Sequence, residues 1–229
     1  VILVLSALAI GGGLLMWLFV PDGPYLGRSG RIDPRALSVV WRDTRVRASV
    51  LGYFGHMWEL YGMLMVVPLV FAHYLQAQAT PLVSWWSFAV IAAGALGCAG
   101  GGLLAGRVGS GAVATVQLAI SALCCLLSPW LLSAPWWIFV AWMLVWGTTV
   151  SGDSPQFSAL TARNSPPEVV GSVLTLVNCI GFGISIVSIQ LVAAALRQYP
   201  FEWVLPWLAI GPVLGVWFMR RLAFNGVER

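Results

Sequence analysis

Two ionisable residues, His56 and Glu59, lie three positions apart in the stretch GYFGHMWELYGM, residues 52–63, within a long apolar segment. On a helix this spacing places both side chains on one face, with Tyr53 one turn before His56. A carboxylate at the centre of a membrane-spanning helix costs about 2.5–3.5 kcal/mol on the insertion scale, so acids at this depth usually have a function. Because no arginine lies in the interior of any apolar segment, neither Glu59 nor the second acid, Asp153, is expected to have an ion-pair partner in this chain. Burial then favours the protonated form of Glu59, which makes it a candidate proton carrier.

Two structural alternatives for Glu59 remain open at the level of sequence. In the first, protonated Glu59 is hydrogen-bonded to His56 or Tyr53 and serves only packing. In the second, Glu59 pairs with a residue outside this chain. We favour the functional interpretation, because an acid in an apolar helix is costly to keep.

The second acid, Asp153, lies in the stretch WGTTVSGDSP, residues 146–155. Gly152 and Pro155 are expected to interrupt the helix there, since proline removes a backbone donor. Broken helices beside polar groups are typical of transporter sites and hinges. We expect Asp153 near the cytoplasmic end of its segment and within reach of water, so gating or helix capping is as compatible with it as solute contact. Weaker candidates are Gln156, Asn178, Ser185 and Gln190, since such groups often bridge helices.

The composition predicts an all-α polytopic membrane protein. Hydrophobic residues make up 59% of the chain and charged residues 9%, against about a quarter in soluble domains. Seven apolar runs reach the length of about 20 residues that a bilayer core requires. They are residues 1–20, 48–74, 83–106, 111–130, 135–161, 168–195 and 201–221. The cysteines lie in these runs and are interpreted as small buried apolar residues: Cys98, Cys124, Cys125 and Cys179.

The arginines predict the orientation. If seven spans alternate, all but one of the twelve basic residues, Arg197, fall on one side. That side includes the segment 21–47, and the positive-inside rule places it and the C-terminus in the cytoplasm. The arginines concerned are Arg28, Arg31, Arg35, Arg42, Arg45, Arg47, Arg107, Arg163, Arg220, Arg221 and Arg229.

The segment 21–47 contains a helix signal. Asp33 is a candidate N-cap with Pro34 at the first helical position, and Leu37, Val40 and Trp41 then share a face. We expect a short amphipathic helix on the inner leaflet, with a flexible linker as the alternative for the first half of the segment.

The third apolar run is rich in glycine, which lets helix backbones approach closely. It ends in GLLAGRVG, residues 102–109. This stretch resembles the loop signature between the eighth and ninth helices of the major facilitator superfamily. The match covers Gly102, Leu104, Ala105, Arg107 and Gly109. It departs at Gly106, where the family usually has Asp, and at Ser110, where a basic residue is common.

The resemblance implies a domain organisation. Residues 1–20 would be the last helix of an N-terminal half whose other five helices are missing, 21–47 the central loop, and 48–229 the C-terminal six-helix half. It also implies that Tyr53, His56 and Glu59 face the substrate, and that Gly102, Arg107 and Gly109 belong to a gating loop.

The implied function is secondary transport of a small polar or anionic solute by alternating access, with proton coupling through Glu59 as symporter or antiporter. The protein would be a multi-pass protein of the plasma or inner membrane, with the lipid bilayer, solute, protons and the missing half as partners. No cofactor, metal or nucleic acid is expected.

Three alternatives were weighed. The first is a fragment that cannot transport solute without a partner half. An intramembrane hydrolase is the second, but the chain has neither a His-Glu-x-x-His pair nor a Gly-x-Ser-x-Gly elbow. A retinal photoreceptor is excluded, because the chain has no lysine to form the Schiff base.

Overall fold

The computed structural model describes residues 2–21, 33–76 and 80–224, with side chains as far as Arg220. Within these ranges every regular element is a helix, so the predicted all-α fold is confirmed. The chain divides into two units, residues 1–33 and 34–229, which are described separately. The first contains α1 (Ile2–Phe19), an apolar helix long enough to cross a bilayer.

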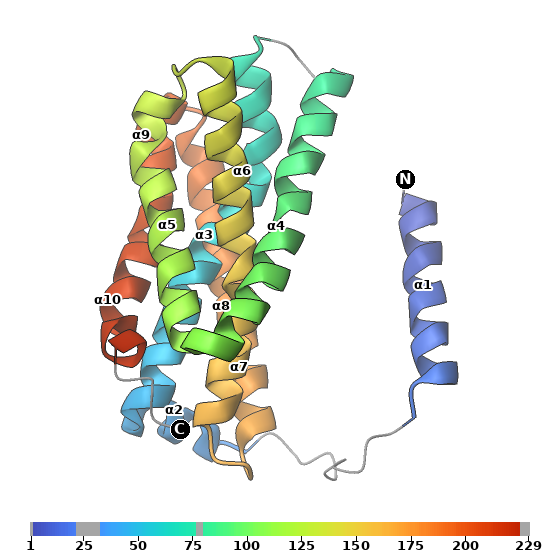
Figure 1. The fold of residues 1–229 in the computed structure, drawn as a ribbon, viewed down its shortest axis with the longest axis vertical. Coiled ribbons are helices and arrows are strands. Elements are labelled where there is room, and N and C mark those ends of the chain that lie inside the picture. Colours follow the sequence, from blue (N-terminus) through green and yellow to red (C-terminus); the bar gives the residue numbers. More distant parts are fainter. Residues whose placement is uncertain (1, 22–32, 77–79, 225–229) are drawn as a thin grey trace. The chain divides into compact units, whose positions relative to one another are not determined.

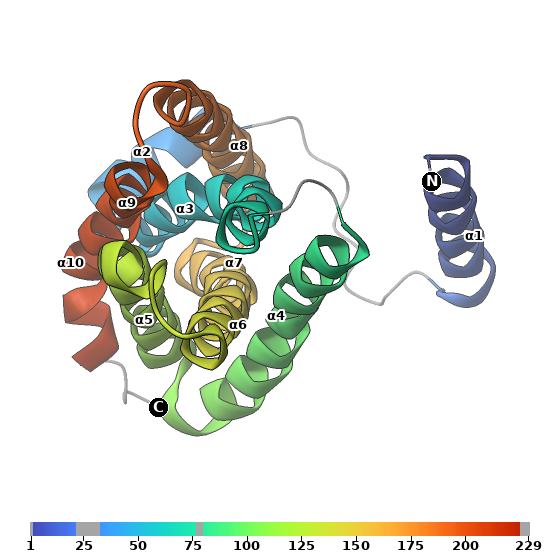
Figure 2. The same cartoon turned by 90° about the horizontal axis from the view of Figure 1, so that it is seen from above.

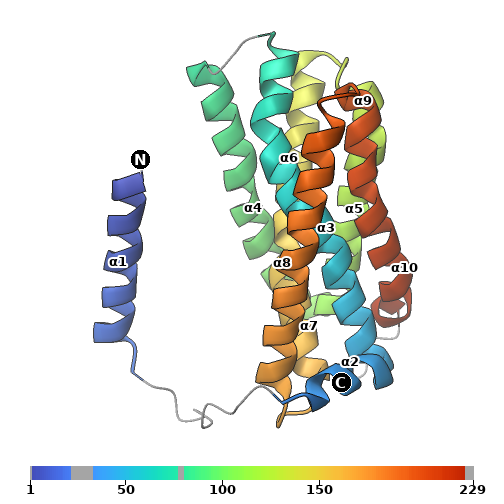
Figure 3. The ribbon, with the colours of Figure 1, turned by 180° about the vertical axis from the view of Figure 1, so that it is seen from behind.

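The second unit is a helical bundle (Figures 1 and 3). Its elements are α2 (Arg35–Arg42), α3 (Thr44–Tyr74), α4 (Pro81–Val108), α5 (Ser110–Leu131), α6 (Trp136–Gly152), α7 (Ser154–Asn164), α8 (Val170–Ala195), α9 (Phe201–Val204), the 3-10 helix η1 (Leu205–Ala209) and α10 (Ile210–Phe224). Viewed from above, α3 lies in the middle, where it packs against α8, α10 and α7 (Figure 2). The side chains of α3 are therefore enclosed on several sides.

Local signals explain where the first two helices of the bundle begin. The carboxylate of Asp43 accepts hydrogen bonds from the backbone N–H groups of Arg45 and Val46, which caps the N-terminus of α3. The prediction for α2 was one residue off. Pro34 is the N-cap rather than the first helical residue.

Six helical segments of the described chain are long and apolar enough to cross a membrane: α1, α3, α4, α5, α8 and the stretch Phe201–Arg220. The remaining predicted run, 135–161, is divided between α6 and α7. The helix is interrupted at Asp153, between α6 and α7, as Gly152 and Pro155 predicted.

The two ends of the bundle differ in composition. The helix α2, the α4–α5 junction and the end of α7 lie at one end, and the turns after α3, α5 and α8 at the other (Figure 1). Arginines flank the first end, as the counting predicted. Arg28, Arg31, Arg229 and the side chain of Arg221 lie outside the described residues. An aromatic cluster occupies the second end: Phe71, Tyr74, Trp86, Trp136 and Phe139.

Glycines allow α4 and α6 to pack backbone against backbone. A Cβ atom on Gly97 would overlap the carbonyl group of Thr148, and one on Gly147 would overlap the carbonyl group of Val90. The predicted role of the glycine-rich run is therefore confirmed for the face that includes Gly97. In contrast, Gly100 has open space where a side chain would be.

Candidate functional site

The polar residues singled out on α3, His56 and Glu59, lie within the bundle, and both are 0% exposed. Close helix packing produces this burial. Gly55, next to His56, lets α3 approach the backbone of Gly211 on α10. A side chain at either position would separate the two helices.

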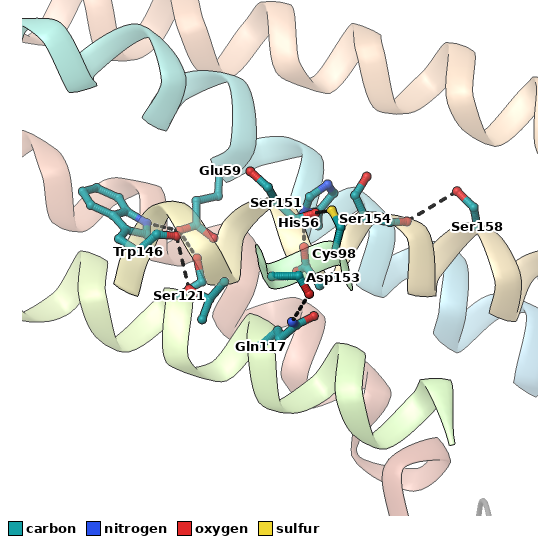
Figure 4. A network of polar contacts seen from close by, with 12 residues as sticks. His56, Glu59, Cys98, Gln117, Ser121, Trp146, Ser151, Asp153, Ser154 and Ser158 are labelled. Atoms are coloured by element: carbon teal, nitrogen blue, oxygen red, sulfur yellow. Dashed lines mark hydrogen bonds and ion pairs between the residues drawn. The ribbon is translucent and has the colours of Figure 1, made fainter. Parts of the chain in front are cut away.

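Glu59 concentrates its contacts on one oxygen (Figure 4). Its Oε1 atom accepts hydrogen bonds from Trp146 Nε1 at 2.6 Å, from Cys125 Sγ at 3.1 Å and from Ser121 Oγ. Its Oε2 atom has no hydrogen-bond partner among the described residues. This asymmetric environment stabilises one carboxyl oxygen as an acceptor and leaves the other available to hold a proton.

His56 contacts Asp153 rather than Glu59. The distance from His56 Nδ1 to Asp153 Oδ1 is 2.9 Å, and both side chains are 0% exposed. Two expectations are corrected here. Asp153 does have a residue within ion-pair distance in the chain, His56, which carries a charge only when it is protonated. Asp153 also does not reach water, because the helices around the α6–α7 break enclose it. The 2.9 Å contact lacks hydrogen-bond geometry, so both ring nitrogens of His56 and both carboxyl oxygens of Asp153 are without a hydrogen-bond partner in the described part of the chain.

The break beside Asp153 has its own set of contacts. Pro155 has no N–H group to donate to the Ser151 carbonyl, one helical turn earlier. The thiol of Cys98 on α4 donates to that carbonyl instead, at 3.3 Å (Figure 4). The backbone N–H groups of Gln156 and Phe157 then donate to the Asp153 carbonyl as α7 begins. The helix is thus interrupted without losing its buried polar contacts.

Aromatic rings adjoin His56. The ring centroid of Tyr53 lies 6.0 Å from that of His56, and the ring of Phe157 on α7 lies 5.7 Å away. Tyr53 also donates a hydrogen bond to Asn178 Oδ1 on α8, at 3.0 Å. The structure therefore connects Tyr53, His56, Asp153 and Asn178 across three segments.

Among the described residues, the side chains of the other polar candidates do not hydrogen-bond to the side chains of this group. Gln156 is buried, and Gln190 is exposed. Ser185 donates to the carbonyl of Met57, which is the helix-bridging role that was expected. Ser188, which was not singled out, donates to the Trp58 carbonyl in the same way.

The residues of the predicted loop signature lie at the α4–α5 junction. Gly109 has a φ of 87°, a backbone conformation that favours glycine and reverses the chain between the two helices. Arg107 is exposed, and Gly102 has open space beside it. The requirement for glycine at 109 thus has a local physical cause.

Three partners of Glu59 were missed: Ser121, Cys125 and Trp146. Ser121 and Cys125 are one turn apart on α5, so they share a face, and this spacing was the available signal. Cys125 was interpreted only as a small apolar residue. It is buried as expected, but its thiol also donates to Glu59.

A surface pocket of about 560 Å³ lies at the aromatic end of the bundle. Its lining comprises Ala72, His73, Tyr74, Gln76, Leu132, Ser133 and Ala134. None of the predicted site residues contributes to it, so the buried acids and this pocket are separate features.

The sequence profile of the Major Facilitator Superfamily matches residues 1–189, and the chain belongs to this family. No curated protein and no solved structure gives a significant match. Members of the family are membrane transporters rather than enzymes. The six long apolar helical segments agree with a multi-pass membrane protein.

Proposed function

We propose that this chain contributes one six-helix half, residues 48–229, of a secondary transporter, and that Glu59 binds a coupling proton. The observation that carries the proposal is the environment of Glu59. The side chain is completely buried, with three donors on Oε1 and no partner on Oε2. Such an arrangement suits a carboxyl group that alternates between protonated and ionised forms.

The burial of Glu59 inside one half gives coupling a physical route. An ionised carboxylate with an unpartnered oxygen in an apolar interior is costly. Proton loss therefore favours a conformation in which water or a cation reaches Oε2. Because the donors to Glu59 come from α5 and α6, such a rearrangement changes how α3 packs against those helices. Under this proposal Glu59 acts by shifting helices rather than by touching solute.

The remaining site residues are proposed to serve the same conformational cycle. His56 and Asp153 join α3 to the α6–α7 break, and Tyr53 and Asn178 join α3 to α8. Gly102, Arg107 and Gly109 are proposed to form a gating loop at the basic end of the bundle. We infer that this end is cytoplasmic in a plasma or inner membrane, because arginines flank it.

The transport pathway of such proteins lies between two six-helix halves, so residues 48–229 provide one wall of it. The alternative proposal follows from this: the chain is inactive until a complementary half is present. Either way, we infer that the solute is small and polar or anionic, and that the protein moves it by symport or antiport.

Proton movement in proteoliposomes tests the proposal. The protein is reconstituted alone and with a complementary six-helix half, the vesicles are loaded with pyranine, and a panel of organic anions, amino acids and sugars is added outside. We expect at least one solute to cause a pH change inside vesicles that contain wild-type protein. Glu59→Gln should abolish that proton signal while the thermal unfolding temperature stays close to wild type.

Glu202→Gln is the matched control, because it removes a carboxylate near the aromatic end of the bundle, away from the buried acids. Its proton signal should equal that of wild type. Solute uptake by Glu59→Gln with an unchanged pH dependence would refute the proton-carrier role. If the wild type gives no pH change with any solute, with or without the complementary half, transport itself is contradicted.

A further inference from the structure

We propose that α2 is a membrane-surface helix that binds the headgroups of anionic phospholipids. This inference is independent of the proton-carrier proposal, because it concerns residues 35–47 and not the buried acids. It extends the expected amphipathic helix to a specific lipid-binding surface.

One sector of α2 is bound to the protein. Ala36 and Val40, one turn apart, are 1% and 6% exposed, and α2 packs against α3 and α8. The neighbouring sector carries Leu37 and Trp41, which are also one turn apart but 50% and 55% exposed. The apolar surface of the helix is therefore wider than the area that the bundle covers. The exposed part continues directly from the buried part.

The next sector of α2 is basic and polar. Arg42 and Ser38 follow Trp41 and Leu37 around the helix, and both are exposed. The segment 33–47 contains four arginines and two aspartates. One of those aspartates, Asp43, is already used to cap α3. The segment that carries the exposed apolar pair thus has a net positive charge.

The position of α2 selects a bilayer surface as the occupant. Only Asp43 separates α2 from α3, which is long and apolar enough to span the membrane. Arg47 also donates a hydrogen bond from Nη1 to the Trp41 carbonyl at 2.8 Å, which connects α3 back to the end of α2. The helix is consequently held where a membrane-spanning segment leaves the bilayer. Tryptophan and arginine side chains favour that interface, and clustered basic residues beside a span attract anionic lipids.

A fluorescent probe on α2 of the full chain tests this assignment. Cys98→Ala and Cys179→Ala first remove the two cysteines that are not buried. A new cysteine is then introduced by Leu37→Cys and labelled with a nitrobenzoxadiazole probe. Ser38→Cys, labelled in the same way, is the matched control. The protein is placed in nanodiscs of phosphatidylcholine with or without phosphatidylglycerol. At the Leu37 position we expect strong quenching by a doxyl-labelled lipid and several-fold weaker quenching by iodide than at the Ser38 position.

The charge component has its own readout. Phosphatidylglycerol should increase the lipid quenching at the Leu37 position, and Arg42→Gln should reduce that increase. Equal iodide quenching at both positions would overturn the proposal. Shielding at Leu37 without lipid quenching would also overturn it, since a protein surface would then cover the helix. A signal that does not respond to phosphatidylglycerol would refute binding to anionic headgroups.

Discussion

His56 and Asp153 bring the middle of α3 into contact with the junction of α6 and α7, with 2.9 Å between His56 Nδ1 and Asp153 Oδ1. The contact joins a continuous helix to an interrupted one. A change in protonation of either partner would alter the attraction between these helices at the point where the second helix is already broken. The contact is therefore suited to control how α7 is oriented relative to α3.

Removal of both partners of this pair should cost less than the sum of the two single removals. His56→Leu or Asp153→Leu leaves a buried polar partner without compensation, which typically costs about 3–5 kcal/mol. In the double variant neither group is left unpaired, so its cost should fall below the sum of the single costs by about 1–3 kcal/mol. The free energy of unfolding is measured in detergent, by heat or denaturant, for the wild type, the two single variants and the double variant. Additive costs would show that the two side chains do not interact.

The close packing of α4 and α6 predicts opposite outcomes for two nearby glycines. Gly97→Ala would force a methyl group into the carbonyl group of Thr148, and overpacking of this kind costs about 1–3 kcal/mol. Gly100→Ala places the same methyl group in open space and should be neutral or slightly stabilising. The unfolding temperatures of the two variants should therefore differ, with Gly97→Ala the lower. Equal temperatures would mean that the helices are not packed this closely.

The helical architecture could be predicted from the sequence because apolar run lengths and Pro and Gly signals act locally. The break at Asp153 was predicted for this reason, since Gly152 and Pro155 are its neighbours in the chain. The contacts of His56 and Glu59 could not be predicted in this way. Their partners, Asp153 and Trp146, are far along the chain and become neighbours only through helix packing. Periodicity identifies the face of a helix but not the helix opposite to it.

The arginine distribution predicts that α2 faces the cytoplasm. A cysteine introduced by Ser38→Cys should not react with a membrane-impermeant maleimide in intact cells, and it should react after permeabilisation. Gln198→Cys, at the opposite end of the bundle and exposed, is the matched control and should react in intact cells. Labelling of the Ser38 position from outside would contradict the orientation. Each signal is compared with that of the wild type, which contains the native cysteines.

The hydrogen bond from Trp146 to Glu59 predicts a coupling that an adjacent tryptophan lacks. Trp146→Phe removes a donor to a carboxyl group, and such hydrogen bonds contribute about 1.5–3 kcal/mol when the acceptor is ionised. Trp142 is the matched control. It lies one turn earlier on α6, is also buried, and donates instead to the Cys124 carbonyl at 3.1 Å.

The two tryptophan variants are therefore each measured with and without Glu59→Gln, by thermal unfolding across a range of pH. The cost of Trp146→Phe should change when Glu59 becomes an amide, and should depend on pH only while Glu59 is present. The cost of Trp142→Phe should be the same in both backgrounds, because its acceptor is a backbone carbonyl that does not titrate. If both variants respond alike to Glu59→Gln, the Trp146 hydrogen bond is not selective for the carboxyl group. The asymmetric environment on which the proton-binding proposal rests would then lack its strongest donor.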